Sequence, residues 1–274
     1  MTDAPRITLA CFGLFGTLVT DPGVIEVAYA EAIATQGIVT GTSAFARAMA
    51  QVHRSRGEPP GEVMAQVFPD NLARGQAAGL AFERSLAGAI ERTAATPIPG
   101  AHEVLAGLAE AGIRICVLTI LPRRQLTATL RAVGWHDLVT VALTADDVPR
   151  GCPFPDLALA AMLRVGVGDV RELLMVHGTA PGLECGRRAG AQAVVGVLTG
   201  PHPEARLAAA GATHVISSVA GLPGVLAGTG PSRHSASGAA STGTGERMTR
   251  SSVAEPPGPV FREQVQARRR ASEL

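Results

Sequence analysis

Three residues with side chains suited to acid, base or nucleophilic chemistry stand near the ends of apolar segments: Thr119, Cys152 and His177. If those segments are strands of one parallel sheet, their carboxyl ends meet at one edge and bring the three residues to the same rim. A thiol beside an imidazole can act as a nucleophile or proton donor, and Thr119 could donate to a developing oxyanion. The alternative is that Cys152 fills space and His177 is a partly exposed loop residue. We favour this alternative, because a sequence supplies no distance between the two side chains.

A second hypothesis concerns an anion at the same rim. Arg123 and Arg124 begin the helix expected after Thr119, and Thr179 precedes another expected helix. The N-terminus of a helix leaves backbone N–H groups unpaired, and such groups bind phosphate or carboxylate. Thr119, Arg123 and Thr179 therefore form a candidate anion-binding set that would need no catalysis.

Metal and lysine chemistry are not expected. Cys11, Cys116 and Cys185 fall within expected strands or helices, and no two cysteines form a CxxC pair. His53 and His102 lie on expected helices without a second ligand three or four residues away. The chain has 24 lysine and arginine residues, and all of them are arginine, so no lysine can form a Schiff base or balance a carboxylate.

The spacing of apolar residues predicts an α/β protein. A buried strand over residues 6–12 is followed by four consecutive helical segments, and after Pro97 strands and helices alternate. Alternation is typical of a doubly wound parallel sheet, because each crossover must return the chain to the same end of the sheet. The expected helices cover 24–36, 43–55, 61–74, 76–92, 100–111, 123–133, 155–165, 181–189 and 203–210, and the later strands cover 113–118, 139–143, 173–176, 193–198 and 213–216.

The same pattern divides the chain into three parts. We expect residues 1–20 and 97–227 to form an α/β core, and residues 21–96 to form a helical cap inserted after the first strand. Residues 228–274 are rich in Gly, Ser, Thr, Pro and Arg and contain few large apolar side chains. Burial cannot offset the entropy of ordering such a segment, so we expect a disordered tail.

Composition argues against several classes of protein. The net charge is +1 and 46% of the residues are hydrophobic, which fits a packed globule without a basic field for nucleic acid. No apolar run approaches the roughly 18 to 20 residues of a membrane helix, and the N-terminus lacks a basic segment followed by an apolar signal core. We expect a cytoplasmic protein with no membrane or nucleic-acid partner.

Three stretches in the second half of the chain carry a family resemblance. They are 147–151 with Pro153, Pro155 and Asp156, then Glu184 with 186–190, and finally 194–200. In this order and spacing they are similar to the phosphonatase-like hydrolase branch of the haloacid dehalogenase (HAD) superfamily, and the likeness extends over about residues 6–226. The resemblance implies a Rossmann-like core with an inserted helical cap and, in an ordinary member, Mg²⁺-dependent chemistry on a phosphoryl group.

The charged residues that this chemistry needs are absent at the matching positions. The resemblance implies a nucleophilic Asp, an acid/base Asp, a Lys and two acidic metal ligands, where the sequence has Gly13, Phe15, Cys152, Gly178 and Gly182. Thr119 keeps the phosphoryl-binding role that the resemblance gives it. Because Mg²⁺ normally relies on carboxylates, we expect no metal cofactor and no family phosphoryl transfer.

The leading functional hypothesis is a non-catalytic binding or regulatory protein, a pseudoenzyme that takes a small molecule or a protein partner at the cleft between cap and core. One alternative is an enzyme with a rebuilt pocket, in which Cys152, His177 and Thr119 act on a non-phosphorylated or carbonyl substrate beside an apolar wall at Phe15. A further alternative is weak residual HAD-type hydrolysis.

Overall fold

The structure is a computed structural model, and it describes residues 6–228. Six parallel strands form one sheet in the order β3-β2-β1-β4-β5-β6. β1 lies between β2 and β4, with Gly13 opposite Leu118 on one side and Phe12 opposite Val176 on the other. The strands are β1 (Leu9–Gly13), β2 (Arg114–Thr119), β3 (Val141–Thr144), β4 (Leu173–His177), β5 (Ala193–Val197) and β6 (His214–Ile216).

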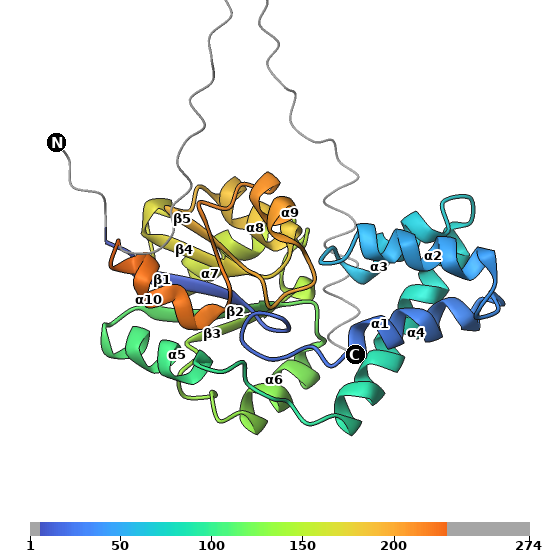
Figure 1. The fold of residues 1–274 in the computed structure, drawn as a ribbon, viewed down its shortest axis with the longest axis horizontal. Helices are drawn as coiled ribbons and strands as arrows, with labels where there is room; N and C mark the ends of the chain where they lie inside the picture. The colour runs from blue at the N-terminus through green and yellow to red at the C-terminus, as the bar shows by residue number, and fades with distance from the viewer. Residues whose placement is uncertain (1–5, 229–274) are drawn as a thin grey trace, which may run out of the picture. The chain divides into compact units, whose positions relative to one another are not determined.

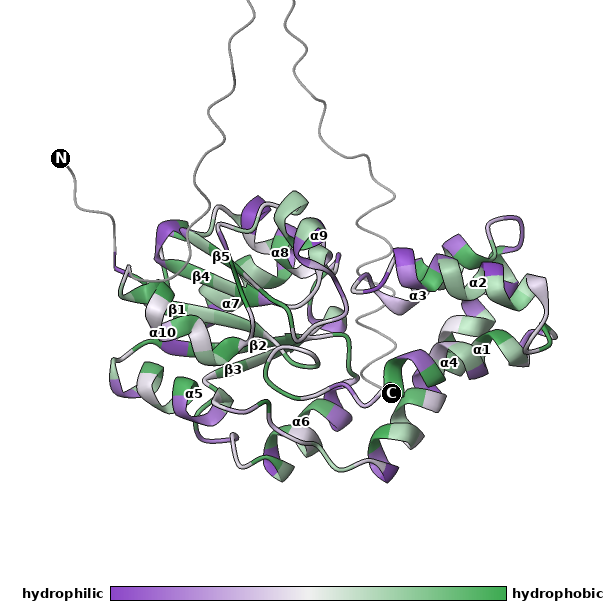
Figure 2. Cartoon of the chain, viewed as in Figure 1, coloured by the Kyte–Doolittle hydropathy of each residue, from purple (hydrophilic) through white to green (hydrophobic). Residues whose placement is uncertain are grey.

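Helices cover both faces of this sheet (Figure 1), and the strands carry buried apolar residues on both sides. Ala10 and Phe12 belong to one buried cluster with α5 and α6, whereas Leu9 and Cys11 belong to a second cluster with α7, α8 and α9. Alternate residues of a strand point to opposite faces, and burial of both faces is typical of parallel sheets. The helices are α5 (Ala101–Glu110), α6 (Arg123–Ala132), α7 (Asp156–Val165), α8 (Ala180–Ala189), α9 (Glu204–Ala209) and α10 (Leu222–Leu226). Figure 2 shows the apolar colour on the central strands and mixed colours along α5 and α6.

Five helices lie between β1 and β2 in the chain, and we call the first four of them the helical insertion. They are α1 (Val24–Thr35), α2 (Ser43–Arg54), α3 (Pro60–Val67) and α4 (Leu72–Arg92), and they form a group of their own in Figure 1. The rings of Tyr29 on α1 and Phe82 on α4 pack with their centroids 4.1 Å apart. Two of the expected helix boundaries were wrong: the break falls at residues 68–71 and not at Gly75, because the Asn71 side chain accepts a hydrogen bond from the Arg74 N–H group and caps α4.

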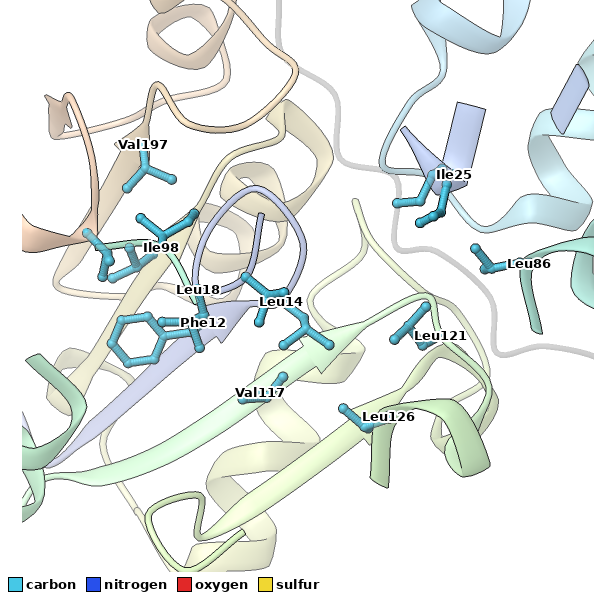
Figure 3. Close-up of a cluster of buried hydrophobic side chains, with 14 of the residues drawn as sticks. Phe12, Leu14, Leu18, Ile25, Leu86, Ile98, Val117, Leu121, Leu126 and Val197 are labelled. Atoms are coloured by element: carbon cyan, nitrogen blue, oxygen red, sulfur yellow. The ribbon is translucent and has the colours of Figure 1, made fainter. Parts of the chain in front are cut away.

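Buried side chains connect the insertion with the sheet. Phe12, Leu14 and Leu18 gather at the end of β1 near Ile98, and the same cluster includes Ile25 of α1 (Figure 3). The loop after β1 therefore packs against the sheet through one part of this cluster and against α1 through another. The separation of core and cap into domains stays a prediction, and the predicted disordered tail lies almost entirely outside the described residues. No helix within residues 6–228 is long and apolar enough to cross a membrane.

Candidate functional site

A pocket lies between the carboxyl edge of the sheet and the helical insertion. The empty space within it is about 760 Å³, and this includes space that is open to solvent. The sheet and its loops contribute Phe15, Leu118, Thr119, Ile120, Ala145, Cys152, Leu157, His177, Thr179 and Pro201. The loop after β1 and the insertion contribute Asp21, Ile25, Tyr29, Arg56, Gly57 and Pro59.

His177 is the last residue of β4, and its imidazole reaches the end of β1. Its Nδ1 atom accepts a hydrogen bond from the Thr179 N–H group at 3.1 Å. A neutral imidazole that accepts at Nδ1 carries its proton on Nε2. Burial lowers the pKa of His177 to about 4, so the ring is neutral at pH 7. The ring therefore presents an N–H donor and no charge.

Two glycines provide the space that this ring fills. A Cβ atom built on Gly13 would lie 2.7 Å from Nε2 of His177 and 2.8 Å from Oγ1 of Thr17. A Cβ atom built on Gly182 would lie 2.2 Å from Cγ of the same ring. Non-bonded carbon atoms pack at about 3.5 to 4.0 Å, so the ring in this position excludes a side chain at either glycine.

Four backbone N–H groups at the start of α8 and in the loop before it already donate to protein side chains. They are therefore not free to bind an anion. The acceptors lie 2.8 to 3.3 Å from the nitrogen atoms. The pairs are Gly178 N–H to Thr17 Oγ1, Thr179 N–H to His177 Nδ1, Ala180 N–H to His202 Nδ1, and Gly182 N–H to Thr179 Oγ1. A phosphate or carboxylate at this helix end would have to displace these bonds.

Cys152 lines the same pocket as His177, which brings the two candidate catalytic residues to one cavity. The Cys152 thiol interacts with Cys185 on α8, and this interaction together with burial raises the pKa of Cys152 well above its ordinary value. A thiol in this environment stays protonated near neutral pH, so the surroundings do not favour the reactive thiolate that a cysteine nucleophile needs.

The three candidate anion-binding residues are divided between two places. Thr119 and Thr179 line the pocket, and Thr119 Oγ1 accepts a hydrogen bond from the Leu121 N–H group at 3.2 Å. Arg123 is not part of the pocket lining; its guanidinium pairs with Asp147 and donates to the carbonyl of Ala142 at 2.8 Å. No free cation accompanies the two threonines among the described lining residues.

Sequence reasoning missed the polar residues that the helical insertion and its first loop bring to the pocket. Arg56 forms an ion pair with Asp21 and a second, 3.7 Å pair with Glu26. The hydroxyl of Tyr29 is buried and has no hydrogen-bond partner within the described residues. Tyr29 is the only tyrosine of the chain.

The comparisons with known proteins agree with this architecture. A model of the haloacid dehalogenase-like hydrolases matches residues 7–190, two thirds of the chain. The chain belongs to this HAD-like hydrolase family. A phosphonoacetaldehyde hydrolase of Bordetella pertussis is 32% identical over 171 residues, which cover 53% of this chain and 62% of that protein. One of Hahella chejuensis is 40% identical over 111 residues, which cover 39% and 37%. The chain thus spans less than two thirds of these relatives.

Solved structures support the fold of this HAD-like protein. A phosphonoacetaldehyde hydrolase-like protein from Oleispira antarctica superposes with a TM-score of 0.71 at 24% identity, and the match covers 82% of this chain and 93% of that one. At this identity the likeness shows the fold alone.

The residues present do not fit the Mg²⁺ ion that the family implies. Within residues 6–228, no group of three or more His, Cys, Asp or Glu side chains could hold a metal ion. Asp21 is the one carboxylate among the described residues that line the pocket, and it is already paired with Arg56. Mg²⁺ is normally bound through carboxylates, so the described residues that line the pocket lack the ligands that this ion needs.

Proposed function

We propose that this HAD-like protein has lost phosphoryl-transfer chemistry and binds a small molecule in the pocket between the sheet and the helical insertion. The observation that carries the proposal is the His177 ring, which lies over Gly13 and against Gly182. By the family resemblance, these glycines stand where the nucleophile and a metal ligand are expected. Glycine can neither attack phosphorus nor bind Mg²⁺, and the ring leaves no room for a carboxylate.

An enzyme with a rebuilt pocket is the second candidate, because Cys152 and His177 line one cavity. Its chemistry would begin with proton transfer from the thiol to the imidazole. The pKa of Cys152 is raised and that of His177 is lowered to about 4, so both groups favour their neutral forms. The transfer would therefore be strongly uphill, and we rank binding first.

The proposal is tested by a phosphate-release assay with and without Mg²⁺. The substrates are p-nitrophenyl phosphate, phosphonoacetaldehyde, phosphoglycolate and a set of sugar phosphates. We expect release equal to the buffer blank for each of them. His177→Ala is the matched control, because phosphate release by a contaminant would be the same in both preparations. Metal-dependent turnover that co-purifies with the wild-type protein and changes in His177→Ala would overturn the proposal.

A further inference from the structure

Building on the proposed binding function, we propose that the pocket takes a neutral small molecule that carries a carbonyl group on an apolar skeleton. His177 and Tyr29 provide the hydrogen-bond donors that the pocket offers to the carbonyl oxygen. Three features of the described residues carry this inference: two donors without partners, charges that are already paired, and walls that are mainly apolar.

The first donor is the Nε2–H group of His177. Because Nδ1 accepts from the Thr179 backbone, the proton of the neutral ring resides on Nε2. No acceptor among the described residues forms a hydrogen bond with Nε2, although Nδ1 is engaged twice by Thr179. His177 lines the pocket. A ligand with an acceptor atom would give this donor the partner that the protein does not provide.

The second donor is the hydroxyl of Tyr29, whose side chain also lines the pocket. Tyr29 is only 1% exposed, and its hydroxyl has no hydrogen-bond partner within the described residues. A buried polar group without a partner is costly, so such groups are normally satisfied. Burial raises the pKa of this hydroxyl, so it keeps its proton and can donate. The unsatisfied hydroxyl points to a bound acceptor.

The charges around the pocket do not suit an anion. Arg56 is the one cation among the described lining residues, and Asp21, which also lines the pocket, pairs with it. Glu26 pairs with the other guanidinium nitrogen of Arg56 at 3.7 Å. The described lining therefore has no unpaired positive charge to offset a carboxylate or a phosphoryl dianion. Desolvating an uncompensated charge is far more costly than desolvating a carbonyl group.

Apolar side chains form most of the remaining wall. Phe15 and Leu118 come from the sheet side, and Ile25 comes from α1. Ile120 follows β2, and Leu157 belongs to α7. A charged or heavily hydroxylated molecule would lose its hydration against these side chains without compensation. An apolar skeleton would gain free energy of binding from the same contacts, because its apolar surface would be removed from water.

Four probes that share a phenyl ring distinguish binding of a neutral carbonyl group from binding of an apolar molecule or an anion. Acetophenone carries a neutral carbonyl group, ethylbenzene has the same size without an acceptor, benzoate is an anion and phenylphosphonate is a dianion at high pH. Binding is followed by NMR titration of methyl-labelled protein. The methyl signals of Ile25 and Ile120 report on the pocket. Leu163 on α7 is 82% exposed and outside the lining, so its methyl signals report on non-specific contact.

Tyr29→Phe removes the hydroxyl and leaves the ring in place. We expect saturable binding of acetophenone to the wild-type protein, weakened by about three- to tenfold in Tyr29→Phe, as for one lost hydrogen bond. Ethylbenzene binding should be the same in both proteins. Thr129→Val is the matched control, because it removes another buried hydroxyl that lacks a partner but lies outside this pocket. This control should leave the affinity for acetophenone unchanged.

The outcomes distinguish this inference from the proposed function. Tighter binding of phenylphosphonate or benzoate than of acetophenone would refute the charge argument, and the binding function would still stand. Equal affinity for acetophenone and ethylbenzene, an unchanged affinity in Tyr29→Phe, or no binding of any probe at the Ile25 and Ile120 methyl groups would refute carbonyl recognition. Metal-dependent phosphate release would refute the proposed function itself.

Discussion

The His177 ring packs against Gly182, and this predicts that the effect of Gly182→Ala on the free energy of unfolding changes sign when the ring is removed. A double-mutant cycle measures this change. Gly182 lies in the first turn of α8, where alanine normally stabilises a helix by about 0.5 to 1 kcal/mol relative to glycine. In the wild-type protein the added Cβ atom would lie 2.2 Å from Cγ, 2.3 Å from Cδ2 and 2.5 Å from Nδ1 of His177. Gly182→Ala should therefore destabilise the wild-type protein.

The size of this destabilisation follows from the overlap between the added Cβ atom and the His177 ring. An ordinary carbon contact needs about 3.5 Å, so the ring would have to move by more than about 1 Å. Its hydrogen bond to Thr179 and its position over Gly13 oppose that movement. Overpacking of this kind costs about 1 to 3 kcal/mol, and it outweighs the gain in helix propensity. In a His177→Ala background the obstacle is gone, so Gly182→Ala should stabilise by about 0.5 kcal/mol.

Urea unfolding of the wild-type protein, both single variants and the double variant measures the cycle. Gly107→Ala in α5 is the matched control, because Gly107 is an exposed helical glycine with nothing within 4 Å of a built Cβ atom. This control should stabilise by about 0.5 to 1 kcal/mol in both backgrounds. If Gly182→Ala destabilises equally with and without the His177 ring, the ring does not fill the space described and the reasoning about this site is refuted.

Two further predictions concern titration. Burial lowers the pKa of His177 and of His202 from 6.5 to about 4, so between these values the unfolded chain binds more protons than the folded one. The free energy of unfolding should therefore fall by up to about 3 kcal/mol per histidine as the pH drops from 6.5 to 4. Urea midpoints should show a weaker pH dependence in His202→Asn, whose Oδ1 can still accept from the Ala180 N–H group; an unchanged slope would contradict the assignment. The raised pKa of Cys152 predicts negligible alkylation by iodoacetamide below about pH 8 in the folded protein. Intact-mass measurements would contradict this if Cys152 reacted rapidly at pH 6 to 7 and His177→Ala removed the reaction.

The doubly wound sheet was predictable from sequence because its signals are local and repeated. Each strand is a short apolar run followed by a helical period, and parallel pairing is the arrangement that such alternation favours. The break between α3 and α4 was not predictable in the same way. Gly75 looks like a helix end, but its built Cβ would lie 3.3 Å from the Met64 carbonyl oxygen, so the glycine allows α4 to approach α3 closely. A role in packing between helices leaves no local signal.

The candidate site was predictable in its location and not in its contents. Thr119, Cys152 and His177 do line one pocket. Thr119 and His177 are the last residues of β2 and β4, and Cys152 lies in the loop between β3 and α7. Sequence treats Gly13 and Gly182 as two separate losses, whereas the structure relates both to the His177 ring. Tyr29 was missed because an unsatisfied hydroxyl is a property of the packed chain, which no pattern of residue types records.

The surroundings of the three glycines at the matching positions determine what a substitution to aspartate would require. At Gly178 a built Cβ would lie 2.7 Å from Cα of Gly200 and 2.8 Å from the carbonyl oxygen of Gly16, so backbone and not a flexible side chain closes that position. The His177 ring closes the other two, Gly13 and Gly182. Aspartate at Gly178 would therefore require backbone near Gly16 or Gly200 to move, and aspartate at Gly13 or Gly182 would require the His177 ring to move. The neutral His177 ring and the backbone around Gly178 leave little room for a carboxylate at these positions, which is consistent with the proposal that the pocket takes a neutral ligand.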